Sequence, residues 1–133
     1  MGLRPGSRFA FNAAAQGKVV LAFGPPHIAT RVYDNPLPRV TPRTITKAAV
    51  LTDEIRRCRE DGWAEAPDEL FLGINALAAP LFYPDRSLMG TLAIVGFTEA
   101  LRGSKRKKAL RKLISTAAEI SASLAGPDRP DPV

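Results

Sequence analysis

The chain has 133 residues, of which 45% are apolar and 24% are charged. These proportions are ordinary for a globular protein and indicate one domain around a single core. No apolar run reaches the roughly 18 residues that a membrane-spanning helix needs, and no secretory signal is visible at the N-terminus. The single cysteine, Cys58, excludes an internal disulfide. We therefore expect a cytoplasmic protein with no membrane partner.

The formal net charge of +6 is a mild excess, and much of it comes from one basic run. This run extends from Lys105 to Lys112. Surfaces that bind single-stranded nucleic acid interleave aromatic residues with basic ones, whereas the neighbours here are Ala109, Leu110 and Leu113. We therefore interpret the run as the solvated face of a helix.

The N-terminal part of the chain predicts a short strand followed by helices. Residues 1–7 are expected to be a loop or the remnant of a linker. Alternation of apolar residues predicts a strand over Arg8–Asn12, and composition predicts a helix over Ala13–Phe23. Gly17 costs that helix about 1 kcal/mol relative to alanine, which points to close packing or access to the backbone. His27–Tyr33 is expected to form a second, short helix.

A further helix is predicted to begin at Thr46, whose hydroxyl can cap the first turn, and to end near Asp61. Trp63–Glu65 is expected to be a short strand, and the last helix is expected over Lys105–Leu124. The tail, residues 127–133, has the composition of a disordered segment. The residues expected to face inward from the helix that begins at Thr46 are Val50, Leu51, Ile55 and Cys58.

The most apolar stretch of the sequence, from Asp68 to Phe97, predicts a hairpin. Phe71–Phe82 and Leu88–Val95 are the two strands, and Pro84–Ser87 supplies the turn between them. Continuous apolar runs of this kind are typical of strands that are covered on both faces. The small residues within them indicate that a helix or a ligand lies close to the backbone. Since strands and helices do not alternate regularly, the fold class is predicted to be α+β.

The sequence offers no catalytic or metal-binding set. One histidine and one cysteine, His27 and Cys58, cannot form a His/Cys zinc site. Asp68 and Glu69 are neighbours, so in a strand they point to opposite faces and do not cooperate as acid and base. Neither a glycine-rich phosphate loop nor a nucleophile elbow is present. We expect no cofactor, and an enzyme is the less favoured alternative.

Six segments, taken in order, resemble bacterial transcriptional regulators of the IclR type. They are NAAAQGKVVLAF (12–23), TPRTIT (41–46), IRRCREDGWA (55–64), DELFLGINALAAP (68–80), LAIVGF (92–97) and AAEISASLAG (117–126).

The resemblance implies a GAF-like domain, with a central antiparallel sheet flanked by helices, over residues 8–126. In this family a winged helix-turn-helix domain binds DNA, and a C-terminal domain binds a small effector, usually a carboxylate metabolite. The resemblance covers only the second, so we expect a fragment or a short natural protein whose DNA contact depends on a helix-turn-helix domain absent from this chain. The family also implies a homodimer or homotetramer. An oligomerisation scaffold without a ligand stays open as an alternative.

The resemblance also implies an effector site. Relatives that bind very small acids have polar residues in the turn and the strands of this site, where this chain has alanine or valine. The resemblance and this departure imply an effector larger and less polar than a two- or three-carbon keto acid, held at its polar end by Gln16 and nearby amides. The expected ligand-binding residues are Phe9, Ala15, Gln16, Ala66, Ala76, Ala93 and Val95.

Overall fold

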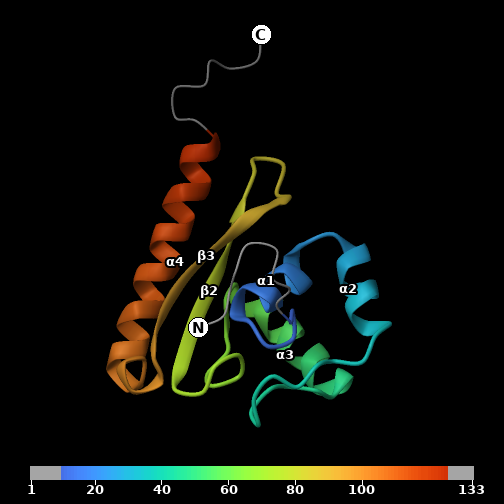
Figure 1. The fold of residues 1–133 in the computed structure, drawn as a ribbon. Helices are drawn as coiled ribbons and strands as arrows, with labels where there is room; N and C mark the ends of the chain where they lie inside the picture. Colours follow the sequence, from blue (N-terminus) through green and yellow to red (C-terminus); the bar gives the residue numbers. More distant parts are fainter. Residues whose placement is uncertain (1–9, 126–133) are drawn as a thin grey trace, which may run out of the picture.

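The computed structural model describes residues 10–125, and its helices and antiparallel sheet confirm the α+β class (Figure 1). The expected linker at residues 1–7 and the expected tail at 127–133 lie outside the described residues. The elements, in chain order, are α1 (Ala15–Phe23), α2 (Pro26–Tyr33), α3 (Ala48–Asp61), β1 (Ala64–Glu65), β2 (Ile74–Phe82), β3 (Leu88–Phe97), the short 3₁₀ helix η1 (Thr98–Ala100) and α4 (Gly103–Ala125).

The sheet has three antiparallel strands in the order β1-β2-β3. β2 and β3 form the predicted hairpin, in register from Ile74 opposite Phe97 to Phe82 opposite Leu88. The turn is stabilised by Asp85, whose Oδ1 accepts a hydrogen bond of 2.9 Å from the backbone N–H of Ser87. This side-chain contact is the one that the turn residues favour.

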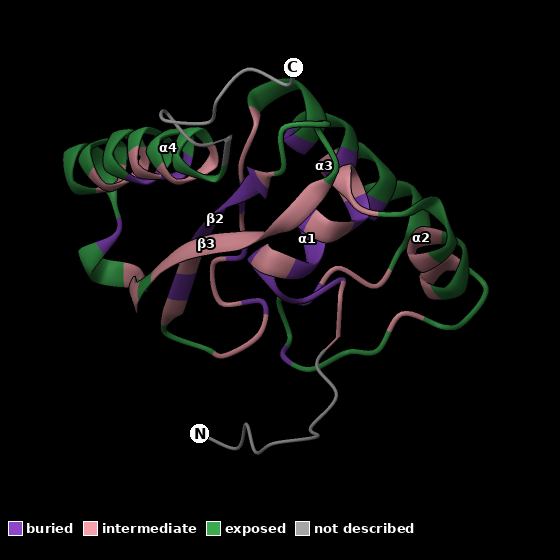
Figure 2. Ribbon diagram, turned by 90° about the horizontal axis from the view of Figure 1, so that it is seen from above, coloured by how far each residue is buried: buried purple, intermediate pink, exposed green. Residues whose placement is uncertain are grey.

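Helices cover the two faces of the sheet, α1 on one and α4 on the other (Figures 1 and 2). Because side chains alternate along a strand, β2 contributes to both layers. Ala78 packs against Ala15 and Val19 of α1, whereas Leu77 packs against Leu113 of α4. The prediction that the strand is covered on both faces is therefore confirmed for β2.

That prediction is wrong for the end of β3. Val95 is 60% exposed and Phe97 is 70% exposed. β3 pairs along one edge only, and the nine residues of α1 cover the part of its face around Ala93. Among the described residues, Val95 and Phe97 lie beyond the reach of α1 and are left largely exposed.

The opposite edge of the sheet is protected. β1 is two residues long and pairs only with Leu77 and Ala78, which leaves the end of β2 uncovered. There Pro80 has no backbone N–H to offer, and the N–H of Phe82 donates to Ser121 Oγ at 3.0 Å. No free N–H donor of β2 therefore points outward from these two residues.

The segment before α1 is a turn, not the predicted strand. The described part of Arg8–Asn12 continues into a turn in which the N–H of Ala13 donates to the carbonyl of Ala10 at 3.0 Å. Asn12 is buried, and its Nδ2 donates to the carbonyls of Pro38 and Ile45 at 3.0 and 2.7 Å. Asn12 thus holds in place the loop that contains Pro38 and Ile45, which lie 26 and 33 residues further along the chain.

Two features of the predicted third helix also differ. Lys47, not Thr46, occupies the N-cap, because the Thr46 hydroxyl accepts a hydrogen bond from Arg39 instead. Val50 is 47% exposed, while the other three residues expected to face inward are buried. Gly17 follows the close-packing prediction, since a Cβ there would lie 2.5 Å from the carbonyl oxygen of Phe11.

A buried lysine joins four parts of the fold. The side chain of Lys18 in α1 is fully buried, and its Nζ donates to Glu69 Oε1 at 2.8 Å, to the carbonyl of Glu65 at 2.9 Å and to Glu54 Oε2 at 3.3 Å. These acceptors use all three donors of the ammonium group. Burial raises the pKa of Glu69 above its usual range, and the neighbouring Lys18 opposes that shift.

Arg106 anchors α4 to the edge of the sheet. Its guanidinium donates to both carboxylate oxygens of Glu65, at 2.6 and 2.9 Å, and lies 5.1 Å from the centre of the Trp63 ring. Burial alone would raise the pKa of Glu65, but the hydrogen bonds and charge of Arg106 bring it below its ordinary value of 4.5.

No helix within residues 10–125 is long and apolar enough to cross a membrane.

Lys18→Met tests the buried cation. The substitution leaves the buried Glu69 carboxylate without its partner, and we expect the free energy of unfolding in a denaturant titration to fall by about 3 to 5 kcal/mol. Replacing both partners, Lys18→Met with Glu69→Leu, is expected to recover part of this loss. Arg56→Met is the control, because Arg56 pairs with Asp53 and Glu60 in solvent. Equal losses for Lys18→Met and Arg56→Met would contradict the expectation.

Arg106→Gln tests the anchor of α4 through its pH dependence. A carboxyl group whose pKa is lowered by folding adds stability above its ordinary pKa, and this stability is lost as the pH falls. We therefore expect the melting temperature of the variant to lie well below that of the wild type at pH 7, and this gap to narrow below about pH 4.5. Arg102→Gln is the control, since its partner Glu99 is exposed.

Candidate functional site

A cavity of about 210 Å³ lies between the start of α1, the loop from Asp68 to Gly73 and the face of the sheet. Its lining side chains are small or apolar, apart from one glutamine. The lining residues are Ala14, Ala15, Gln16, Ala66, Leu70, Phe71, Ile74, Ala76 and Val95.

Five of the seven residues expected from the sequence line this one cavity: Ala15, Gln16, Ala66, Ala76 and Val95. Ala93 does not line it. Ala93 lies two residues before Val95 in β3, and its side chain packs against the buried cluster that contains Ala15 and Val19 of α1. Phe9 lies outside the described residues.

Leu70 and Phe71 are lining residues that the sequence did not indicate as such. Phe71 was expected in the strand, but β2 begins at Ile74, and the residues before it form a loop over the cavity. The left-handed backbone of Gly73, with φ of +81°, ends that loop. In the sequence, Gly73 is the residue that indicates an interruption of the apolar run before Ile74, because glycine readily adopts a left-handed backbone.

Hydrogen bonds fix this loop as a wall of the cavity. The hydroxyls of Thr41 and Thr44 donate to the carbonyls of Asp68 and Glu69, each at 2.7 Å. Asp68 Oδ1 accepts in turn from the N–H of Gly73 at 2.7 Å and from the hydroxyl of Thr98. The wall is thus held from both sides, and its side chains have little freedom to collapse into the cavity.

The polar end of the cavity is the N-terminus of α1. Ala14 stands at the N-cap, no side chain caps the helix, and its first turn has no acidic residue. The first N–H groups of a helix have no partner within the helix, and the helix dipole makes this end positive. Gln16 adds the only polar side chain among the described lining residues. This end is suited to an anionic or hydrogen-bond-accepting group.

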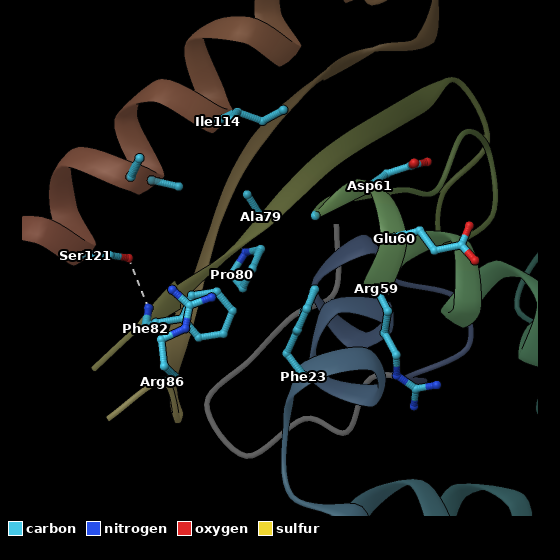
Figure 3. A pocket seen from close by; sticks show the side chains of 13 residues that line it. Phe23, Arg59, Glu60, Asp61, Ala79, Pro80, Phe82, Arg86, Ile114 and Ser121 are labelled. Carbon is cyan, nitrogen blue, oxygen red and sulfur yellow. Dashed lines mark hydrogen bonds between the residues drawn. The ribbon is translucent and has the colours of Figure 1, made fainter. Parts of the chain in front are cut away.

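A larger cavity, of about 470 Å³, lies between the end of α3, the uncovered end of β2 and α4 (Figure 3). Phe23 and Phe82 meet edge to face with 5.5 Å between their ring centres, and Arg86 lies 5.2 Å above the ring of Phe82. Figure 3 shows that Arg59 points away from Pro80, and its Nε donates to the carbonyl of Ala22 at 3.0 Å.

The charged side chains around this larger cavity are exposed to solvent. It is therefore an open groove, and the ionic groups along it keep their water. The smaller cavity combines an apolar interior with one polar end, which is the usual composition of a small-molecule site. We regard the smaller cavity as the candidate site.

Cys58, the one cysteine of the chain, lines neither of these two cavities. Burial raises the pKa of the Cys58 thiol to about 12, so the reactive thiolate is not formed near neutral pH. The described residues contain no cluster of three side chains that could hold a metal ion. The composition of the smaller cavity is suited to binding a small molecule.

Comparison with known proteins identifies the domain type. The family model "Bacterial transcriptional regulator IclR C-terminal" matches residues 1–122. The glycerol operon regulatory protein of Streptomyces griseus is 30% identical over 125 residues, which are 92% of this chain and 48% of that protein. The transcriptional repressor YiaJ of Escherichia coli is 29% identical over 95% of this chain and 46% of its own length. The chain thus spans about half the length of the curated relatives it matches.

Solved structures agree. A putative IclR-type regulator from Silicibacter superposes with a TM-score of 0.83 at 27% identity, over 94% of this chain and 50% of that one. An IclR homologue from Microbacterium hydrocarbonoxydans, solved with 4-hydroxybenzoate, has a TM-score of 0.79 at 23% identity, over 89% and 47% of the two chains, and so shares the fold. The relatives are named as transcriptional regulators, which makes this a regulatory domain and not an enzyme. The chain belongs to the family of IclR-type bacterial transcriptional regulators, and what it matches is their C-terminal domain.

Proposed function

We propose that the chain senses an organic acid with a hydrophobic body, bound in the 210 Å³ cavity, and thereby controls DNA binding by a winged helix-turn-helix domain. The observation that supports this most directly is the polarity of the cavity. One end is the uncapped start of α1 beside Gln16, and the remaining walls are apolar.

The polar end accounts for the acid group. A carboxylate loses much of its hydration on burial and needs hydrogen-bond donors in exchange. The N–H groups of the first turn of α1, which no side chain caps, and the Gln16 amide are donors at one end of the cavity. These donors would hold the carboxylate in place of the polar side chains expected in a site for a very small acid.

The apolar walls account for the hydrophobic body. Burial of apolar surface is worth about 25 cal/mol per Å², and an apolar cavity of about 150 Å³ in another protein holds benzene. The cavity here, at about 210 Å³, is of the size that an aromatic or medium-chain acid requires. The Microbacterium homologue holds 4-hydroxybenzoate, and its similarity to this chain supports the fold.

Ala76→Phe tests the site by filling the cavity. We expect 4-hydroxybenzoate to raise the melting temperature of the wild type. Since Ala76 lines the cavity, the variant is expected to fold and to show no such shift. Ala118→Phe is the matched control, because Ala118 is exposed and lines only the larger groove. It is expected to keep the full thermal shift.

Three results would contradict the proposal. Loss of the shift in Ala118→Phe but not in Ala76→Phe would place the site in the groove. Stabilisation by pyruvate or glyoxylate at micromolar concentration, with none by aromatic or medium-chain acids, would refute the inferred effector class. No stabilisation by any acid of a broad set would favour an oligomerisation scaffold.

DNA provides a separate test. The part of the regulator that this chain matches is the C-terminal domain, so we expect it to bind an operator duplex and a scrambled duplex with equal affinity. Any binding should weaken steeply with salt, because it would arise from the basic face of α4 alone. Fluorescence anisotropy at physiological salt checks this, and a preference for one duplex sequence would contradict it.

A further inference from the structure

The polar groups of the candidate cavity are confined to one end. Gln16 carries the only polar side chain among the described residues that line it, and it stands in the uncapped first turn of α1. The first N–H groups of that helix have no partner within it. A ligand whose acid group occupies this end therefore meets apolar side chains along the rest of its body. Those side chains belong to Ala66, Leu70, Phe71, Ile74, Ala76 and Val95.

Leu70, Phe71 and Ile74 form a wall whose main chain is already hydrogen-bonded. The carbonyl of Phe71 accepts from the N–H of Ile74 at 3.2 Å, and the carbonyl of Ile74 accepts from the N–H of Asp68 at 3.0 Å. The two threonine hydroxyls described above hold the loop in place, so its other main-chain groups are not readily turned inward. A ligand hydroxyl that reaches this wall finds no polar side chain on it, and these two carbonyls are in use.

Gln16 can make both kinds of hydrogen bond. Its side-chain amide offers donors and an acceptor, and no hydrogen bond joins this amide to another described residue. The N–H groups at the start of α1 can only donate, so they suit a carboxylate and cannot accept the proton of a hydroxyl. The Oε1 atom of Gln16 is therefore the acceptor available to a hydroxyl that stands next to the acid group.

We propose that the site selects its effector by the position of the polar groups. A hydroxyl on the carbon next to the carboxylate is accepted at Gln16, whereas one at the far end of the hydrophobic body is rejected by the wall of Leu70, Phe71 and Ile74. The effector class that fits is a 2-hydroxy acid with an aromatic or branched body. This inference rests on the proposed function, because it requires an acid in this cavity.

The rejection has a physical basis of known size. A buried hydroxyl without a partner is costly, and an apolar enzyme pocket separates a methyl group from an isosteric hydroxyl by about a hundredfold. 4-Hydroxybenzoate carries its hydroxyl at the far end, so we expect it to bind in the same cavity and less tightly than benzoate.

Mandelate and 4-hydroxyphenylacetate test the proposal. The two acids are isomers that carry the same charge at pH 7, and they differ in whether the hydroxyl stands beside the carboxylate or at the far end of the ring. Titration calorimetry of the full chain measures each enantiomer of mandelate, its isomer and phenylacetate, which has no hydroxyl. We expect the better enantiomer of mandelate to bind about tenfold more tightly than 4-hydroxyphenylacetate, a difference of about 1.4 kcal/mol.

Two variants assign the selectivity to residues. Ile74→Thr places a hydroxyl in the wall, and we expect the affinity ratio of mandelate to 4-hydroxyphenylacetate to fall about fivefold, the worth of one hydrogen bond. Ile74→Val, which has the same shape as the threonine variant without the hydroxyl, is the matched control and should keep the ratio. Gln16→Met removes the amide, and we expect the affinity ratio of mandelate to phenylacetate to fall about fivefold.

The possible failures are distinguishable. If phenylacetate binds and 4-hydroxyphenylacetate binds as tightly as mandelate or more tightly, this inference is wrong and the proposed function stands. If none of the three acids binds, both are wrong. Ratios that stay unchanged in both Ile74→Thr and Gln16→Met would overturn the assignment of the selectivity to these residues.

Discussion

The fold depends on one buried ammonium group. Lys18 has no exposed side-chain surface, and its three donors reach α3, β1 and the loop that follows β1. A buried charge is costly unless every hydrogen bond is made, so these segments must hold their positions together. The cavity shares this constraint, because Gln16 stands two residues before Lys18 and Leu70 directly follows Glu69. The geometry of the candidate site is therefore set by the same ion pairs that hold α1 against the sheet.

Local patterns in the sequence were sufficient for the hairpin and for the existence of the four α-helices of the described residues, but not for the short 3₁₀ helix η1. The turn around Asp85 and the buried positions Leu51, Ile55 and Cys58 follow from neighbours in the chain. The partners of Lys18 did not, because they lie 36 to 51 residues away and leave no periodic signal. Glu54, whose side chain is partly exposed on α3, is one of these partners. The expected cavity residues came from a family resemblance, which did not indicate Ala14, Leu70, Phe71 or Ile74. Two of these four, Leu70 and Phe71, belong to a loop that the apolar run concealed.

The small residues of the hairpin illustrate why sequence alone left two interpretations open. Ala78 and Ala93 lie under α1, as a packed helix requires. Ala76, two residues before Ala78 on the same face, packs against the edge of this cluster and also borders the cavity. One row of small side chains thus lets a helix approach the sheet at one end and leaves a cavity at the other. Composition cannot separate the two, because the difference is made by where α1 begins, at Ala15.

The end of β2 beyond β1 is protected from pairing with another chain, although β1 covers only two residues of this strand. There Pro80 offers no donor and the donor of Phe82 is occupied by Ser121, so an incoming strand finds no free N–H on these two residues. One proline and one serine hydroxyl thus replace, at this edge, the longer strand that would otherwise be needed to keep other chains away.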